Sequence, residues 1–309
     1  MNRVLVTGGA GSIGSNLAAL LVERGHDVTV LDDLSSGHRD LVPPSVRFVQ
    51  GSIEDEGALV QAFAARPQWV FHLAALFANQ NSVDHPQRDL AVNGGGTVKV
   101  LQQAVAGNAA KLLFTSSSCV YGHKEVMRED DQAYDLDTPY AISKLLGEHY
   151  CRYWSRQFGI DTVVVRLFNT YGPHEHPGRY RNVIPNFFAL AMRGEPLPIT
   201  GTGEETRDFN FVGDVVRGLV HAMAAPTPAG EVYNLASGTA TRIGDLARSI
   251  NEITGNRAGL AFKPRRDWDH VVTRRGDPSK ARQAFGYTAA TPLERGLRLT
   301  HEWLRTVVA

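Results

Sequence analysis

Cysteine is scarce in this chain of 309 residues, which has only two, Cys119 and Cys151. Two thiols exclude a disulfide framework and a four-cysteine zinc site. An excess of charge of one sign is also lacking, because 32 Lys and Arg residues balance 32 Asp and Glu residues. The chain therefore has no overall electric field that would favour binding to nucleic acid or to an anionic membrane.

Long apolar runs are missing as well. None approaches the roughly 20 residues that a membrane-spanning helix needs, and a strand pattern begins at residues 3–6 with no basic leader or cleavage site before it. His174 and His176 are spaced like metal ligands, but no third ligand accompanies them, so no metal site is expected. These absences favour a soluble, cytoplasmic enzyme with no membrane partner.

The first half of the chain alternates short apolar runs with helical patterns. Strand-like runs occur at residues 4–6, 28–31, 46–49, 69–71, 111–114 and 162–166, and helical spacing covers residues 16–22, 57–65, 92–106 and 140–158. Repeated strand–helix units predict an α/β fold with a doubly wound parallel sheet, which binds its ligand at the carboxyl ends of the strands. Ser116–Cys119 follow one such strand directly, so we expect their side chains to face a ligand.

A glycine-rich turn joins the first strand to the first helix. Gly8, Gly11 and Gly14 allow a tight turn and let a pyrophosphate approach backbone N–H groups at the helix N-terminus. Asp32 ends the second strand, where a carboxylate suits the two hydroxyls of an adenosine ribose and repels a 2′-phosphate. The alternative is an ordinary glycine turn followed by a helix-capping aspartate. The order strand, turn, helix, strand favours a dinucleotide-binding site, and Asp32 favours NAD rather than NADP as the cofactor.

From about Gly172 the alternation loosens. Residues 173–181 are rich in Gly, Pro and His, which predicts a long binding loop. Helical spacing returns at residues 246–253 and 293–304. We therefore expect an NAD-binding Rossmann domain over residues 1–172, with later sheet elements from about 205–240, and a smaller mixed α/β substrate lobe over residues 173–309.

Tyr140 and Lys144 are four residues apart in a helical pattern, so they project from one face of the helix. An ammonium beside a phenol favours the phenolate, which lowers the pKa of Tyr140. Such a phenol could exchange a proton with a sugar or alcohol hydroxyl. The alternative is a surface Tyr–Lys pair without a role, which the pair taken alone does not exclude.

With these features the chain resembles the extended short-chain dehydrogenase/reductase family, in particular its NAD-dependent nucleotide-sugar epimerases and dehydratases such as the UDP-sugar 4-epimerases. The segments that carry the resemblance span essentially the whole chain. They are Gly8–Gly14, Asp32–Gly37, His72–Ala75, Asn93, Ser116–Ser117, Tyr140 with Lys144, Arg166–Pro173, Asn182–Pro185, residues 201–209 and Asp277–Ala281.

The resemblance implies a role for individual residues by position. Tyr140 would be the acid/base, Lys144 would lower its pKa and bind the nicotinamide ribose, and Ser117 would hydrogen-bond the sugar hydroxyl. The implied cofactor-binding residues are Gly8, Gly11, Ser12, Ile13, Gly14, Asp32, Asp33, Leu34, Ser35, Ser36, Gly37, Ser52, Ile53, Leu73, Ala74, Ala75, Asn93, Tyr140, Lys144 and Phe168. The implied substrate-binding residues are Ser117, Ser118, Cys119, Asn169, Asn182, Val183, Ile199, Arg207 and Arg266.

The substrate implied by the resemblance is a nucleotide sugar. At least one of four arginines is expected to reach its phosphates, and the spacing does not tell which: Arg265, Arg266, Arg274 or Arg275. Relatives of this kind also suggest a homodimer.

The resemblance implies oxidation at a sugar carbon, usually C4, but leaves the outcome open. A 4-epimerase returns the hydride to the other face of a transient 4-keto sugar. A dehydratase or dehydrogenase is the alternative, although Ser118 and Cys119 stand where the family's dehydratases commonly have Asp and Glu. Cys119 would be either a thiolate base or a small packing residue. A non-catalytic dinucleotide-binding sensor is the remote alternative.

Overall fold

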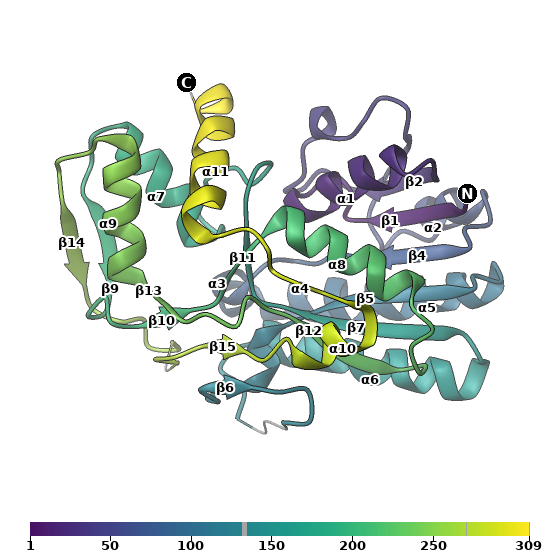
Figure 1. Ribbon diagram of the computed structural model, residues 1–309. Helices are drawn as coiled ribbons and strands as arrows, with labels where there is room; N and C mark the ends of the chain where they lie inside the picture. The colour runs from purple at the N-terminus through teal and green to yellow at the C-terminus, as the bar shows by residue number, and fades with distance from the viewer. Residues whose placement is uncertain (132–134, 270, 309) are drawn as a thin grey trace.

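The computed structural model describes residues 1–131, 135–269 and 271–308. Its centre is a parallel sheet of seven strands, within these ranges, in the order β12-β7-β5-β4-β1-β2-β3 (Figure 1). The strands are β1 (Arg3–Thr7), β2 (Asp27–Asp32), β3 (Arg47–Gln50), β4 (Trp69–His72), β5 (Lys111–Ser117), β7 (Asp161–Leu167) and β12 (Glu231–Leu235). The direction of strand order reverses at β1 and β4, which confirms the predicted doubly wound, Rossmann-like sheet.

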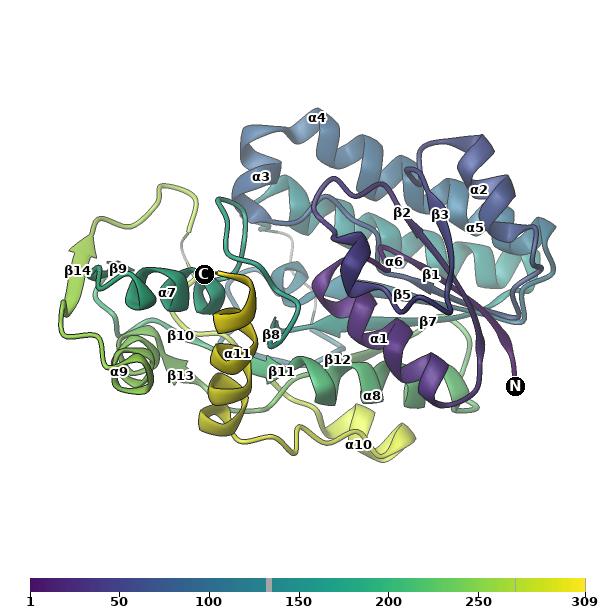
Figure 2. The ribbon, with the colours of Figure 1, turned by 90° about the horizontal axis from the view of Figure 1, so that it is seen from above.

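Helices cover both faces of this sheet (Figure 2). On one face lie α1 (Ser12–Glu23) and α8 (Val212–Ala224), and on the other lie α2 (Glu56–Phe63), α5 (Thr97–Ala106) and α6 (Pro139–Phe158). The helix expected over residues 92–106 is α-helical only in its second part, because a π-helical turn at Leu90–Gly96 precedes it. Three consecutive glycines occupy that turn, and a Cβ on Gly96 would lie 2.5 Å from Ile53 Cδ1.

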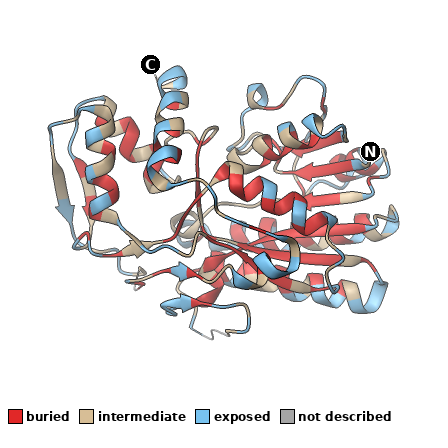
Figure 3. Ribbon diagram, in the orientation of Figure 1, coloured by how far each residue is buried: buried red, intermediate tan, exposed pale blue. Residues whose placement is uncertain are grey.

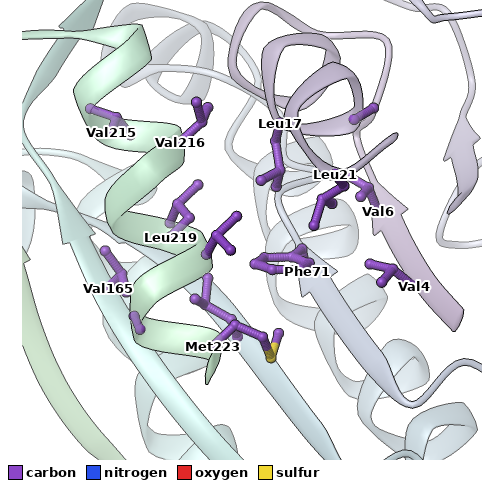
Figure 4. Packing of buried hydrophobic residues seen from close by; sticks show 14 of the residues in the cluster. Val4, Val6, Leu17, Leu21, Phe71, Val165, Val215, Val216, Leu219 and Met223 are labelled. Carbon is purple, nitrogen blue, oxygen red and sulfur yellow. The ribbon is translucent and has the colours of Figure 1, made fainter. Parts of the chain in front are cut away.

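The core explains why the strands have continuous apolar sequences. The sheet is covered on both faces, so the strand interiors are buried while connections at its ends are exposed (Figure 3). Figure 4 shows the layer between the sheet and α1 and α8, where Val6 of β1 and Val165 of β7 meet Leu17, Leu21 and Leu219. A second layer, formed mainly with α2, α5 and α6, fills the opposite face.

Helix α6 carries the Tyr–Lys pair and has clear signals at both ends. Thr138 accepts a hydrogen bond from Ala141 N at the N-terminus, Pro139 occupies the first turn, and Gly159 ends the helix with φ of +71°. Gly147 faces β5, and a Cβ there would lie 2.4 Å from Phe114 Cζ. The missing side chain lets α6 approach the sheet closely, which brings Tyr140 to the end of β5.

The C-terminal part has its own apolar core, formed by α7 (Val183–Met192), α9 (Ile243–Thr254), α11 (Leu293–Val307) and the parallel pair β9 (Leu197–Thr200) and β14 (Leu260–Lys263). The other α-helices of the described residues are α3 (Asn79–Asp84), α4 (Pro86–Asp89) and α10 (Ser279–Phe285), and 3-10 helices span Arg39–Leu41 and Ser118–Tyr121. Short strand pairs are β8 (Asn169–Tyr171) with β11 (Phe209–Phe211), β10 (Thr206–Arg207) with β13 (Thr241–Arg242), and β6 (Val126–Met127) with β15 (Arg275–Gly276). Within the described ranges, no helix is long and apolar enough to cross a membrane.

Candidate active site

A cavity of about 930 Å³ opens at the carboxyl ends of the sheet strands, and residues from both halves of the chain line it. Most of the predicted site residues line this one cavity. They are Gly8, Gly11, Ser12, Ile13, Gly14, Asp32, Asp33, Leu34, Ser35, Ser36, Gly37, Ser52, Ile53, Leu73, Ala74, Ala75, Ser117, Ser118, Cys119, Tyr140, Lys144, Phe168, Asn169 and Asn182. Five predicted residues do not line it: Asn93, Val183, Ile199, Arg207 and Arg266.

The glycine turn leaves no room for side chains. Gly8 has φ of +71°, and a Cβ on it would lie 2.6 Å from Ala74 N, while a Cβ on Gly14 would lie 2.1 Å from Gly8 O. The backbone is therefore bare where α1 begins, just after Gly11. A bare backbone at a helix N-terminus is the surface that a pyrophosphate group requires.

Asp32 closes the same turn from the end of β2. Its Oδ2 accepts a hydrogen bond from Ala10 N at 2.9 Å, and its Oδ1 accepts one from Leu34 N at 2.8 Å. Burial raises the pKa of Asp32, and these two hydrogen bonds oppose the rise. Each carboxylate oxygen keeps a second lone pair, so the residue still fits the hydroxyls of an adenosine ribose. The turn and Asp32 together fit NAD.

Ser117, Tyr140 and Lys144 lie together at the end of β5. Ser117 and Tyr140 are 9% and 6% exposed, and Lys144, one helical turn beyond Tyr140, is 3% exposed. Lys144 Nζ donates to Thr115 O at 3.0 Å and lies 5.7 Å from the centre of the Tyr140 ring. Burial lowers the pKa of Lys144 to about 8, against the opposing charge of Asp89.

The expected depression of the Tyr140 pKa by Lys144 does not occur in this arrangement. Burial, reinforced by the negative charges of Cys119 and Asp89, raises the pKa of Tyr140, and only a hydrogen bond with Ser117 opposes the rise. The physical reason is that both members of the pair are desolvated, and desolvation disfavours the charged form of each. Tyr140 is therefore a protonated phenol at neutral pH in this arrangement.

A buried ion pair fixes α6, the helix that carries Tyr140, to β7, and a further hydrogen bond fixes it to β5, the strand that carries Ser117. Glu148 of α6 accepts from Arg166 Nε at 2.9 Å and from Arg166 Nη2 at 2.8 Å, and it also accepts from Ser116 Oγ at 2.5 Å. Arg166 belongs to β7 and Ser116 to β5. The three residues thus link three elements beneath the cavity.

Asn93 serves the site from behind the cavity wall. It is 2% exposed, its Oδ1 accepts from Leu76 N at 2.8 Å, and its Nδ2 donates to Asp89 Oδ1 at 2.7 Å and to Ser143 Oγ at 3.2 Å. These contacts hold the loop after β4 against α6. The two remaining apolar residues outside the cavity wall belong to the C-terminal elements, Val183 at the start of α7 and the fully buried Ile199 in β9.

The structure separates the arginines that the sequence left equivalent. Arg274 lines the cavity and is 9% exposed, with Nη1 3.4 Å from Cys119 Sγ. Arg207 lies behind it, where it pairs with Asp269 at 3.4 Å and burial lowers its pKa to about 10. Arg266 lies over the ring of Trp268, 5.5 Å from its centre. Of the described arginines at 265, 266, 274 and 275, only Arg274 lines the cavity.

The loop over residues 173–182 adds cavity residues that the sequence did not assign. It reaches the loop that follows β2: Arg181 donates to Ser36 O, and the rings of His176 and His38 lie 4.0 Å apart. Glu175 is 3% exposed, and burial raises its pKa to about 7 despite the charge of Arg181 and hydrogen bonds from Asn182. The Gly, Pro and His content of this segment indicated a binding loop, but no local pattern indicated its partner.

A family model described as the NAD dependent epimerase/dehydratase family matches residues 4–236. The chain belongs to this family. The match covers the glycine turn, Asp32, Ser117, Tyr140 and Lys144, so the family's cofactor, NAD, agrees with the groups that line the cavity.

Known members are similar over the full length of the chain. A UDP-glucose 4-epimerase of Mycolicibacterium smegmatis is 33% identical over 98% of each chain. A UDP-N-acetyl-alpha-D-glucosaminuronate decarboxylase of Bacillus cytotoxicus is 32% identical, over 99% of this chain and 98% of the other. The solved structure of an epimerase from Methanothermobacter thermautotrophicus has a TM-score of 0.97 and 46% identity, over 99% of this chain and 92% of the other. The protein thus belongs to an enzyme family that includes both epimerases and decarboxylases of UDP-sugars.

Proposed function

We propose that this protein is an NAD-dependent nucleotide-sugar 4-epimerase, which acts on a UDP-hexose or a related sugar through a transient 4-keto intermediate. The observation that carries the proposal is the cluster of Ser117, Tyr140 and Lys144 at the end of β5, in one cavity with the glycine turn and Asp32. Bound NAD supplies reversible hydride transfer. The chain's own residues have to move one proton and hold the sugar.

Tyr140 is the residue proposed to move the proton. Its phenolate form would take the proton of the sugar C4 hydroxyl as that carbon is oxidised, and the phenol so formed would return the proton in the reverse step. The raised pKa keeps Tyr140 protonated, which is the form that the return step starts from. The removal step needs positive charge near the ring, and Lys144 with its Nζ at 5.7 Å is the cation proposed to supply it.

The residues beside Ser117 favour the epimerase over a dehydratase. Elimination of water from a keto sugar needs an additional acid or base, and neither Ser118 nor Cys119 is a carboxylate. A uronate decarboxylase remains the second candidate, because one relative of similar identity has that activity. The two reactions differ in product, since epimerisation conserves mass and decarboxylation releases CO₂.

The proposal also assigns parts of the chain. Residues 1–172, with elements from about 205–240, would bind NAD, and residues 173–309 would mainly bind the nucleotide sugar, with Arg274 on its phosphates.

We further propose a homodimer through the outer face of α6 and the turn before α5. Large apolar side chains are exposed there, among them Leu90 at 59%, Ile142 at 56%, Tyr153 at 51% and Phe158 at 53%, and such patches mark interaction surfaces.

The test is incubation of the purified protein with UDP-glucose, UDP-N-acetylglucosamine and UDP-glucuronate, followed by NMR and mass spectrometry of the products. We expect at least one C4 epimer pair to interconvert, with no steady build-up of NADH. The matched control is Tyr140→Phe, which should lower turnover by roughly 10²–10⁴-fold and leave NAD binding intact. Loss of CO₂ from UDP-glucuronate, or loss of water or steady NADH release in place of C4 interconversion with any of the three substrates, would contradict the epimerase assignment.

A further inference from the structure

Cys119 lies in a group of hydrogen-bond donors inside the cavity. Arg274 Nη1 is 3.4 Å from its Sγ, and Asn79 Nδ2 is 3.5 Å away. The amide of Asn79 is oriented by Thr138, whose hydroxyl accepts from Ala141 N and donates to Asn79 Oδ1 at 2.9 Å. The amide therefore presents its N–H₂ group to the sulfur. A guanidinium and an amide N–H that both point at one sulfur stabilise a thiolate.

The positive charges around Cys119 also favour its thiolate form. Burial by itself would raise the pKa of Cys119, but the charge of Arg274 and hydrogen bonds with Ser117, Asn79 and Arg274 outweigh burial, so its pKa is lowered. Arg207 adds a second positive charge near the sulfur, and Tyr140 is the titratable neighbour whose own pKa the sulfur raises.

A second observation, on Arg274, indicates that the cavity wall beside Cys119 binds a ligand. Arg274 is 9% exposed and lines the cavity, yet its buried Nε has no hydrogen-bond partner among the described residues. An arginine with unused donor capacity in a cavity wall indicates a site for an anionic group. Cys119 is partly exposed and lines the same wall, so small molecules that enter the cavity reach its sulfur.

The second cysteine provides a natural comparison. Cys151 is a residue of α6 that is fully buried among the apolar side chains of the core, and burial raises the pKa of its thiol. The two thiols of this chain therefore differ in both properties that govern reactivity, ionisation and access. Because Cys151 is enclosed in the core, it is not placed to form a disulfide with Cys119.

We propose that Cys119 is a covalent modification site, at which soft electrophiles and hydroperoxides react with its sulfur inside the cavity. With an alkyl halide the sulfur forms a bond to carbon and halide leaves. With a hydroperoxide the sulfur attacks the terminal oxygen, the O–O bond breaks, and hydroxide or alkoxide leaves; sulfur is oxidised by two electrons to the sulfenic acid and the peroxide is reduced. Either adduct lies beside Ser117, so it would also block the reaction proposed above, a consequence that rests on the proposed function.

The test is alkylation of the folded wild-type protein with iodoacetamide between pH 5 and 9, with the rate at each cysteine read by peptide mass spectrometry. We expect Cys119 to react on the order of tenfold or more faster than Cys151 at pH 7, with a pH midpoint below that of free cysteine in the same buffer. Arg274→Gln should move the midpoint upward, and Arg274→Lys, which keeps the charge, should restore much of the difference. In parallel, hydrogen peroxide with dimedone should tag Cys119 and spare Cys151.

Wild-type data alone decide the proposal. Equal labelling of the two cysteines, or a Cys119 midpoint at or above that of free cysteine, would overturn it. The labelling does not depend on turnover: a labelled Cys119 in a protein that epimerises no sugar would contradict the proposed function and leave the modification site standing.

Discussion

The buried ion pair between Glu148 and Arg166 offers the sharpest test of how the site is held. Both residues are 6% exposed. The charge and hydrogen bonds of Glu148 raise the pKa of Arg166 above its ordinary value, even though burial acts to lower it. The carboxylate also accepts from Ser116 at 2.5 Å. Glu148→Gln keeps the shape of the side chain but removes its charge, so it leaves a guanidinium buried without a counterion.

An uncompensated buried charge of this kind costs about 3–5 kcal/mol. The unfolding entropy of about 2.1 cal/mol/K per residue, applied to 309 residues, gives about 0.65 kcal/mol/K. The expected fall in melting temperature for Glu148→Gln is therefore about 5–8 °C, measured by scanning calorimetry. Turnover should fall as well, because Glu148 links α6, which carries Tyr140, to β7 through Arg166 and to β5, which carries Ser117, through Ser116.

Two controls make this result interpretable. Glu294→Gln removes the charge from an exposed i,i+4 pair, whose side chains in Arg298 and Glu294 are 58% and 73% exposed, and should lower the melting temperature by less than about 2 °C. The double variant Glu148→Gln with Arg166→Met removes both buried charges and should recover most of the lost stability. If Glu148→Gln resembles Glu294→Gln, or if the double variant melts no higher than Glu148→Gln, the reasoning from the buried charge is refuted.

Two further predictions concern the cavity loop and the assembly. Glu175 has a folded-state pKa of about 7 against 4.5 for its ordinary value, so the folded state holds more protons between these pH values and stability falls as pH rises from about 4.5 to 7. The difference between these two pKa values of Glu175 corresponds to about 3 kcal/mol of stability. Glu175→Gln should therefore raise the melting temperature by about 5 °C at pH 8 and leave it unchanged at pH 4. An equal effect at both pH values would refute ionisation of Glu175 as the cause. Sedimentation equilibrium should give a mass near twice 33.8 kDa, and Ile142→Glu should shift it towards the monomer; a wild-type monomer at micromolar concentration would contradict the dimer.

Much of the cofactor half could be predicted from the sequence because its signals are local. The apolar runs of β1, β2 and β5 follow from strands buried on both faces, and the bare glycine turn follows from spacing alone. Asp32 and Ser117 were expected at the cavity because each ends a parallel strand, and such ends meet at one edge of the sheet. The ends of α6 were likewise indicated by Pro139 and Gly159.

Other features depended on partners distant in the chain. Spacing in the sequence could not tell which of the four arginines at 265, 266, 274 and 275 lines the cavity. The answer depends on which side chain the fold turns towards Cys119, which is 155 residues away from Arg274 in the sequence. Asn93 and Arg207 were expected to contact ligands, but they lie behind the wall, in contact with Asp89 and with Asp269.

By itself, the sequence determined the sheet, the nucleotide-binding turn and the set of reactive groups, because hydrophobic period and strand-end position are properties of short segments. Only the tertiary structure decided the protonation of those groups and which of them face the cavity. Tyr140 and Lys144 illustrate the difference: their spacing indicated a depressed phenol pKa, whereas burial raises it. Burial and through-space charge arise only when distant segments pack together, and these two effects set the chemistry of the site.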